Sequence, residues 1–393
     1  MNHKFYLRIV LLLILLQGIT SIIGNMFYHK VLVVILEALC LIYTVRHSSA
    51  IAQTKLSKIV ILYLCYILFN TFYNFVLAGR GTYDTFIALH ESIWWPMCFL
   101  LAYQYFKNNQ IDQANSKLTI RFFVFILCCN IVILCLQEFY LYSALERMTS
   151  NNVYYVVTLL PFAFLCKKRS LKYILMAIIT LLSVVTLKRT AMIVCALTWL
   201  IDLLSVSNTK NKSKYLFAFF ISLGIIVYGY QKITDVVGES ALERFQGMAE
   251  DGGSGRLDIY KNVLDAYTKL PLDSKILGCG HNAVRRNNVI AYSLSGYDDS
   301  FSAHNDFLEI LYDFGILGLI IYCVFIFRLI KVIYRQRYIN SDLFYSGLAS
   351  LGVLFTMSLF SHLVLYSTYY VYLVFIWGMF TSGGLNQKNE VAV

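Results

Sequence analysis

The sequence is a succession of apolar runs, each about as long as a membrane-spanning helix. A bilayer core is crossed by about 20 predominantly apolar residues in helical form. Backbone polar groups within a bilayer must be hydrogen-bonded inside the segment, so we expect each run to be helical. The twelve predicted spans are 6–24, 28–45, 59–78, 87–106, 119–138, 152–166, 171–187, 190–204, 215–231, 305–327, 343–363 and 366–382. The sequence therefore predicts an all-α polytopic membrane protein with about 12 transmembrane helices and one large helical periplasmic loop. Because 152–166 and 190–204 are short, a re-entrant pair among these runs remains an alternative.

Composition excludes an ordinary soluble protein. Hydrophobic residues make up 59% of the 393 residues and charged residues only 14%, whereas soluble domains have about 25% charged residues. The first run follows a basic start, as a secretory signal would, but it lacks a small-x-small cleavage site and a second apolar run follows directly. We therefore expect an uncleaved first membrane helix.

The basic residues of the connections predict the orientation. With both termini cytoplasmic, the inner segments hold 20 Lys and Arg residues and the short outer connections hold five. This asymmetry satisfies the positive-inside rule. The net charge of +11 is dispersed over many short loops, so we expect the lipid bilayer as surroundings and no nucleic-acid partner.

One connection is far longer than the others. Residues 232–304 form a polar segment on the predicted outer face, and loops of this length are commonly functional. Within it, Leu257, Tyr260, Leu264 and Tyr267 recur at spacings of three and four, which predicts one face of a helix. Three regions follow: membrane spans in 1–231, the large periplasmic loop in 232–304, and the last three spans with a short cytoplasmic tail in 305–393.

The cysteines give no sign of a disulfide or metal framework. Nine of the ten lie within apolar runs, Cys279 lies in the polar loop, and there is no CxxC pair. Thiols in such positions typically act as small apolar groups within a membrane. We expect no metal and no cofactor.

Three basic or titratable residues lie at predicted outer ends of spans and are the main candidates for a site. Arg189 lies between the seventh and eighth spans, Arg256 follows a Gly-rich turn, and His304 precedes the tenth span. Guanidinium groups grip phosphate oxygens, and a histidine near neutral pKa can take a proton from a hydroxyl. The set suits a phosphate-bearing lipid attacked by an alcohol. The alternatives are a snorkelling Arg189, a solvated Arg256 and an interfacial or capping His304.

Carboxylates follow His304 at helical spacing. Asp306, Glu309 and Asp313 share one helix face, which points them at a cavity or at each other. Asp306 and Glu309 also suit a first helical turn, where the helix dipole favours negative charge. A pair of glycosidase type is a further but weakly supported interpretation. His281, in a glycine-rich stretch of the loop, is better explained by turn chemistry than by catalysis.

Several of these features together resemble the O-antigen polymerase and O-antigen ligase superfamily. The likeness rests on His304 and Asn305 opening a late span, the apolar helix after them, and the Gly-x-x-Gly of Gly315 and Gly318. The large loop with "SGR" near its start, the "LP" of the sixth span and a basic residue at the seventh–eighth junction are similar to the same family. The likeness covers roughly residues 150 to 330.

The resemblance implies a metal-independent membrane glycosyltransferase of the C type, acting at the periplasmic face of the bacterial inner membrane. Its donor would be an oligosaccharide on undecaprenyl diphosphate and its acceptor a glycan. Arg189 and Arg256 would bind the diphosphate, and His304 would activate the acceptor hydroxyl, which attacks with inversion. The "KRT" around Arg189 departs from the Ser-Arg-Gly-like run of relatives. The residues expected to support the site are Asn305, Asp306 and Glu309.

Two enzymes within the superfamily fit this chemistry. A polymerase, which we favour, passes the growing chain to another lipid-linked repeat unit, and a chain-length regulator is a possible partner for it. A ligase passes the chain to the lipid A–core. From a different class, a lipid-linked sugar flippase or another transporter also fits twelve spans with embedded charges. We find no internal repeat to support a transporter.

Overall fold

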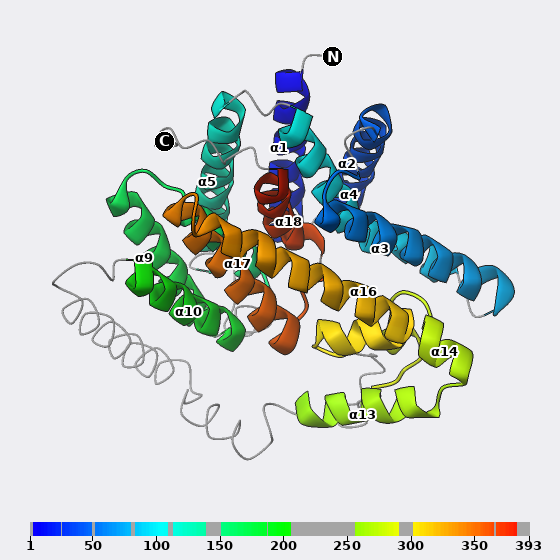
Figure 1. The fold of residues 1–393 in the computed structure, drawn as a ribbon. Coiled ribbons are helices and arrows are strands. Elements are labelled where there is room, and N and C mark those ends of the chain that lie inside the picture. Colours follow the sequence, from blue (N-terminus) through cyan, green and yellow to red (C-terminus); the bar gives the residue numbers. More distant parts are fainter. Residues whose placement is uncertain are drawn as a thin grey trace, which may run out of the picture.

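A computed structural model describes residues 3–24, 26–48, 52–79, 83–108, 113–138, 151–186, 188–205, 256–290, 302–364 and 367–382. These residues form helices and connections, with no strand among them (Figure 1). The prediction of an all-α chain is confirmed for this part. The predicted span 215–231 and the loop stretches 232–255 and 291–301 lie outside the described residues.

The elements follow the predicted runs closely. Their bounds are α1 His3–Ile22, α2 Met26–Arg46, α3 Lys55–Phe72, the π-helical turn η2 Tyr73–Leu77, α4 Tyr83–Asn108, α5 Gln113–Leu136, α7 Tyr154–Val157, α8 Leu160–Ala163, α9 Arg169–Val185, α10 Arg189–Ser205, α13 Arg256–Lys269, α14 Leu272–Leu277, α15 Ala283–Arg286, α16 Asp306–Gln336, α17 Ser341–Phe360 and α18 Ser367–Ser382.

Six segments of the described chain are long and apolar enough to cross a membrane, by length and composition. Four further helices, α4, α9, α10 and α18, coincide with predicted spans without meeting the same combined criterion. The chain is therefore a helical membrane protein, and the count of about 12 spans stays a prediction. The six segments are Phe5–Ile22, Phe27–Arg46, Lys55–Leu77, Lys117–Leu136, Asp306–Gln336 and Ser341–Phe360.

The predicted span at 152–166 is not a continuous helix. It consists of the two four-residue helices α7 and α8, which are buried along their length. Pro161 has no N–H for an i→i−4 bond, so a helix entering from Val157 ends there. The Pro161 carbonyl instead accepts a hydrogen bond of 2.7 Å from the Ser346 hydroxyl of α17. The segment is too short to span a bilayer and serves as packing within the bundle.

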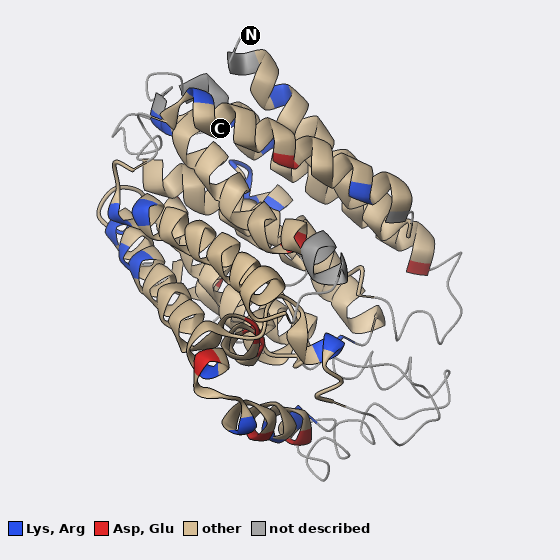
Figure 2. Ribbon diagram, turned by 90° about the vertical axis from the view of Figure 1, so that its right-hand side faces the viewer, with Lys and Arg blue, Asp and Glu red and all other residues tan. Residues whose placement is uncertain are grey.

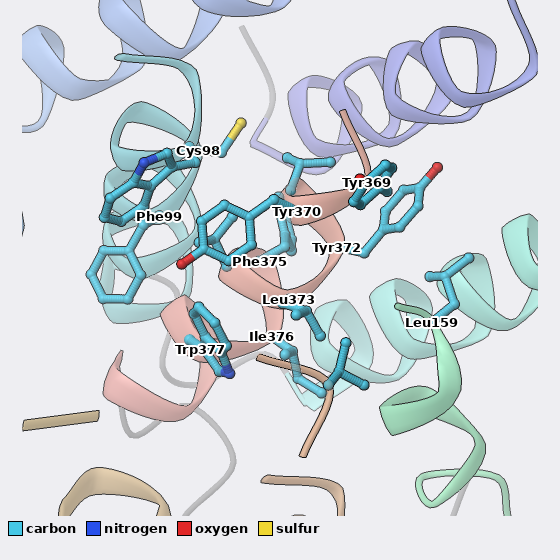
Figure 3. Close-up of a cluster of buried hydrophobic side chains, with 14 of the residues drawn as sticks. Cys98, Phe99, Leu159, Tyr369, Tyr370, Tyr372, Leu373, Phe375, Ile376 and Trp377 are labelled. Atoms are coloured by element: carbon cyan, nitrogen blue, oxygen red, sulfur yellow. The ribbon is translucent and has the colours of Figure 1, made fainter. Parts of the chain in front are cut away.

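The centre of the bundle is formed by α18 packed against α4 (Figure 3). Aromatic rings fill this seam: Trp95 of α4 lies 5.5 Å from Tyr370, and Tyr370 lies 5.7 Å from Trp377, centroid to centroid. All three side chains are fully buried. Tilted and edge-on aromatic pairs at such distances add to the stabilisation from burial alone. This rigid core carries the connection between α17 and α18.

Helix α16 is broken at Gly315, where the backbone has φ +65° and ψ −175°. The segment before the break and the longer one after it run in different directions (Figure 1). Residues 316–336 then form an apolar helix of about 31 Å at 1.5 Å per residue, which matches a bilayer core. The span predicted at 305–327 therefore lies within α16, which is long and apolar enough to cross a membrane, but the helix is interrupted at Gly315. The polar residues after His304 belong to a separate short helix.

The break at Gly315 is also where the segment 256–290 docks. A Cβ on Gly315 would lie 2.3 Å from the Ile276 carbonyl oxygen, and one on Gly278 would lie 2.3 Å from the backbone carbonyl oxygen of Asp313. The two backbones approach so closely that only glycine fits at either position. The break frees the carbonyls of Tyr312 and Asp313. They accept hydrogen bonds from the N–H groups of Cys279 (3.1 Å) and Gly280 (2.8 Å), respectively.

The helix predicted in the loop is present as α13, and Tyr260 and Tyr267 of its predicted face pack against the buried cluster of this region, but the fully buried residues are others. Ile259 and Val263 are buried against α15 and α16, whereas Leu257 is 52% exposed and Leu264 43% exposed. Both faces carry apolar residues at helical spacing, so tertiary contact rather than periodicity selects between them. In Figure 2, α13 lies end-on at the bottom and carries charges of both signs.

Candidate active site

His304 stands on the turn directly before α16. Its backbone is in the left-handed region, with φ +51°, which is uncommon for a residue with a Cβ. Asn305 follows as the N-cap: its side-chain oxygen accepts hydrogen bonds from the N–H groups of Phe307 (3.0 Å) and Leu308 (3.2 Å). A side-chain cap of this kind fixes the start of a helix. The strained turn thus holds the half-buried histidine at a defined place.

Glu309 anchors the turn from the other side. Its Oε2 accepts a 2.7 Å hydrogen bond from the N–H of Ala303, the residue before His304. Both Glu309 and Ala303 are buried. No hydrogen bond joins a carboxylate to the His304 ring in the part of the chain that the structure describes. The carboxylate therefore supports the histidine through its backbone, and support through the imidazole tautomer is not what the contacts show.

Arg256 comes to the same place as the first residue of α13. One turn later, the Tyr260 hydroxyl donates a 2.6 Å hydrogen bond to the Leu359 carbonyl and lies 3.3 Å from the His304 carbonyl oxygen. These contacts dock the start of α13 on the turn before α16 and the end of α17. The structure therefore brings Arg256 and His304 together, as predicted.

The start of α10 lies at the same end of the bundle. Thr190 donates a 3.3 Å hydrogen bond from its hydroxyl to the Phe360 carbonyl at the end of α17. Directly before it stand Lys188 and Arg189, both half-buried. Arg189, which is predicted to bind the diphosphate, precedes Thr190 in the chain. It therefore lies on the side of the bundle where α17 ends and α13 docks.

These cations act on the titration of His304. Burial, then the charges of Arg256 and Lys188, lower the pKa of His304 from 6.5 to about 4. The imidazole is therefore neutral near pH 7 and able to accept a proton. Lys188, which sequence reasoning passed over as part of "KRT", contributes to this field, while Arg189 follows it in the chain.

A second histidine, His362, belongs to the same cluster. The rings of His304 and His362 lie 4.4 Å apart, centroid to centroid. His362 stands in the connection between α17 and α18 and is buried. The sequence held a signal for it, because the predicted topology places the end of the eleventh span at the same face as His304.

The remaining carboxylates of α16 hold other connections. Asp306 accepts hydrogen bonds from the N–H groups of Leu363 (3.0 Å) and Val364 (3.2 Å) and from the Ser358 hydroxyl (2.8 Å). Asp313 accepts from the N–H groups of Asn282 (2.6 Å) and Ala283 (2.8 Å). Buried carboxylates must be paired or hydrogen-bonded, and backbone donors meet that need here. Their shared helix face, predicted from spacing, is used to tie three separate connections to α16.

The same carboxylates line a cavity of about 10 Å³ together with residues of α3 and α4. Space of this size holds about one water molecule. The cavity is therefore too small for a substrate. The lining residues are Tyr63, Ser92, Trp95, His281, Asp306, Glu309, Ile310, Asp313, Phe314 and Val364.

The cluster combines a cationic surface with a neutral proton acceptor. Arginine and lysine side chains bind phosphate oxygens, and a buried neutral imidazole can act as a general base. The arrangement is chemically suited to hold an anionic group while a proton is taken from a neighbouring hydroxyl.

A comparison with family models gives one match for this region. Residues 173–323 match a family model described as O-antigen ligase. The matched range includes the basic residues at the start of α10, Arg256 and the turn with His304, and it ends before His362. No curated protein matches the chain. The resemblance predicted from the sequence is confirmed over this range.

Proposed function

We propose that the chain is a membrane glycosyltransferase that uses His304 as its base, since residues 173–323 match a family model described as O-antigen ligase. The donor is an oligosaccharide carried on undecaprenyl diphosphate, and the acceptor is a sugar hydroxyl. The reaction takes place at the periplasmic face of the bacterial inner membrane.

Arg256 and the basic pair at the start of α10 bind the diphosphate. The observation that carries the proposal is the docking of α13, which begins at Arg256, through the Tyr260 hydroxyl on the turn that bears His304 and on the end of α17. These cations stabilise the bound anion both before and after the sugar–phosphate bond breaks. The stabilisation is largest when the leaving group gains charge. No metal ion is needed for that stabilisation.

His304 takes the proton of the acceptor hydroxyl as its oxygen attacks the anomeric carbon. The new C–O bond forms while the bond to the diphosphate oxygen breaks, and undecaprenyl diphosphate leaves with the electron pair. Attack opposite the leaving group inverts the anomeric centre. The proton on His304 is favoured at this stage, because the negative diphosphate offsets the cations that lower the histidine pKa in the free protein.

The acceptor that we favour is a second lipid-linked repeat unit, which makes the enzyme an O-antigen polymerase. The alternative is transfer to the lipid A–core by a ligase. A strain lacking the chain separates the two through its lipopolysaccharide on a gel. A polymerase predicts core with a single repeat unit, whereas bare core alone would rule out the polymerase and support the ligase.

The direct test is glycan transfer by the purified protein in nanodiscs. His304→Asn is the sharpest variant, since asparagine tolerates the left-handed backbone of this turn but cannot accept the proton. We expect the transfer rate to fall by about 10²–10⁴-fold, the usual contribution of a general base. His281→Asn, at a histidine outside the cluster, is the matched control and should keep its kcat. Full transfer by His304→Asn would disprove the proposal.

A further inference from the structure

His362 is a second imidazole at the site, contributed from outside the region that matches the family model. Its ring is tilted by 34° to that of His304 at a centroid distance of 4.4 Å, and only 6% of the residue is exposed. The two rings come from distant parts of the chain, one from the turn before α16 and the other from the connection between α17 and α18. Their contact is therefore a product of the fold.

The connection that carries His362 is fixed on two sides. The Asp306 carboxylate accepts the N–H groups of the two residues after His362, Leu363 and Val364. The carbonyl of His362 itself accepts a 2.7 Å hydrogen bond from the Tyr369 hydroxyl of α18. Both Asp306 and Tyr369 are buried. A backbone held in this way leaves the ring little freedom to move away from His304.

The surroundings of His362 disfavour a charged ring. Burial is the largest cause that lowers its pKa well below 6.5, and a charged His304 and Arg256 lower it further. The Asp306 carboxylate, which holds this connection, is engaged by backbone N–H groups and the Ser358 hydroxyl. Beside His304, His362 therefore offers a flat, uncharged surface.

We propose that His362 is a positioning residue for His304: its buried ring covers one face of the His304 imidazole and fixes the plane in which that imidazole meets the acceptor hydroxyl. This inference rests on the proposed function of His304 as base. Covering one face also keeps water from competing for the ring. The effect is on the transfer step, because a base displaced by about 1 Å can cost about 10²-fold in rate.

The test compares substitutions that keep or remove a flat surface at this position. His362→Phe keeps an aromatic ring without titratable nitrogens, and His362→Ala removes the ring. We expect His362→Ala to lower kcat by about 10–100-fold at unchanged donor KM, and His362→Phe to restore kcat to within about threefold of the parent with the same pH profile. His362→Asn, whose smaller side-chain amide is planar and does not titrate, serves in place of Phe if the larger ring prevents folding, which thermal unfolding reports.

Two results would overturn the inference. Unchanged kcat in a folded His362→Ala protein would show that the ring contributes nothing to transfer. A folded His362→Phe protein as slow as His362→Ala would show that the imidazole nitrogens are needed, so that His362 moves protons itself. Either result leaves the proposed function intact as long as His304→Asn is inactive. Transfer by His304→Asn would instead remove the premise.

Discussion

Two histidines, His304 and His281, are each held near α16 by a carboxylate of that helix, yet their surroundings differ. The ring of His281 contacts the Ser92 hydroxyl through Nδ1, and its Nε2 lies 3.5 Å from the Glu91 carboxylate. The ring of His304 lies in the field of Arg256 and Lys188 instead, and a second imidazole lies 4.4 Å from it, centroid to centroid, at a tilt of 34°. The ring nitrogens of His281 are thus directed at groups of α4, whereas a ring in a cationic field is suited to reaction beside an anion.

The arginines beside the two histidines repeat this contrast. Arg286 donates hydrogen bonds to the carbonyls of Cys279 (2.6 Å) and His281 (3.3 Å), so its guanidinium is used to hold a loop. Arg256 is half-buried, begins α13 and acts on the site through its charge. The residue types are the same in both places. The two places differ in whether the side-chain polar groups are used to hold a loop.

The largest effect in this comparison is expected from removing the carboxylates that hold the two loops. Glu309→Ala frees the backbone N–H before His304, and we expect kcat to fall by about 10–100-fold through displacement of the base. Asp313→Ala leaves the N–H groups of Asn282 and Ala283 without their acceptor, which costs roughly 1–3 kcal/mol each in the free energy of unfolding.

Kinetics and chemical unfolding of the same purified proteins measure both effects. Glu309→Gln is the control, because Glu309 uses a single oxygen for Ala303 and glutamine keeps an oxygen acceptor. A rate loss in Asp313→Ala as large as that in Glu309→Ala, at equal folding, would remove the distinction between the two loops.

A smaller effect is expected in the pH dependence of kcat/KM, which reports the free enzyme. Arg256 lowers the pKa of His304, so Arg256→Gln should raise that pKa from about 4 toward 6.5 and move the acid limb to higher pH. The neutral base is then lost earlier as the pH falls. Arg286→Gln should leave the limb unmoved. A limb that does not shift in Arg256→Gln would show that the guanidinium charge does not act on the reacting histidine.

Much of the helical layout was predictable from the sequence, because apolar length and basic connections report directly on spans. Arg256 and His304 were singled out because ionisable residues at span ends stand out against an apolar background, and their roles stay predictions. The break at Gly315 was not predicted, because a lone glycine in an apolar run is compatible with a continuous helix. Its cause is a docked loop some 40 residues earlier in the chain, Gly278 against Gly315.

The roles of the carboxylates could not be predicted for the same reason. Asp306 and Ser358 are 52 residues apart, and Asp313 and Asn282 are 31 apart. Helical spacing showed that Asp306, Glu309 and Asp313 share a face but not that backbone N–H groups would occupy them. His362 was not assigned to the site, because the sequence places it only at the predicted face and its contact with His304 is made by the fold.

The central proposal is that the cations bind the donor diphosphate and that His304 takes the proton of the acceptor hydroxyl. Binding of a lipid-linked donor to the protein in nanodiscs tests it most directly, with His304→Asn and Arg256→Gln compared with the parent chain. We predict an unchanged Kd for His304→Asn, and a Kd raised by about 10–100-fold for Arg256→Gln, as expected for the loss of charge-assisted hydrogen bonds. An unchanged Kd in Arg256→Gln, or an equal loss of affinity in His304→Asn, would contradict the account.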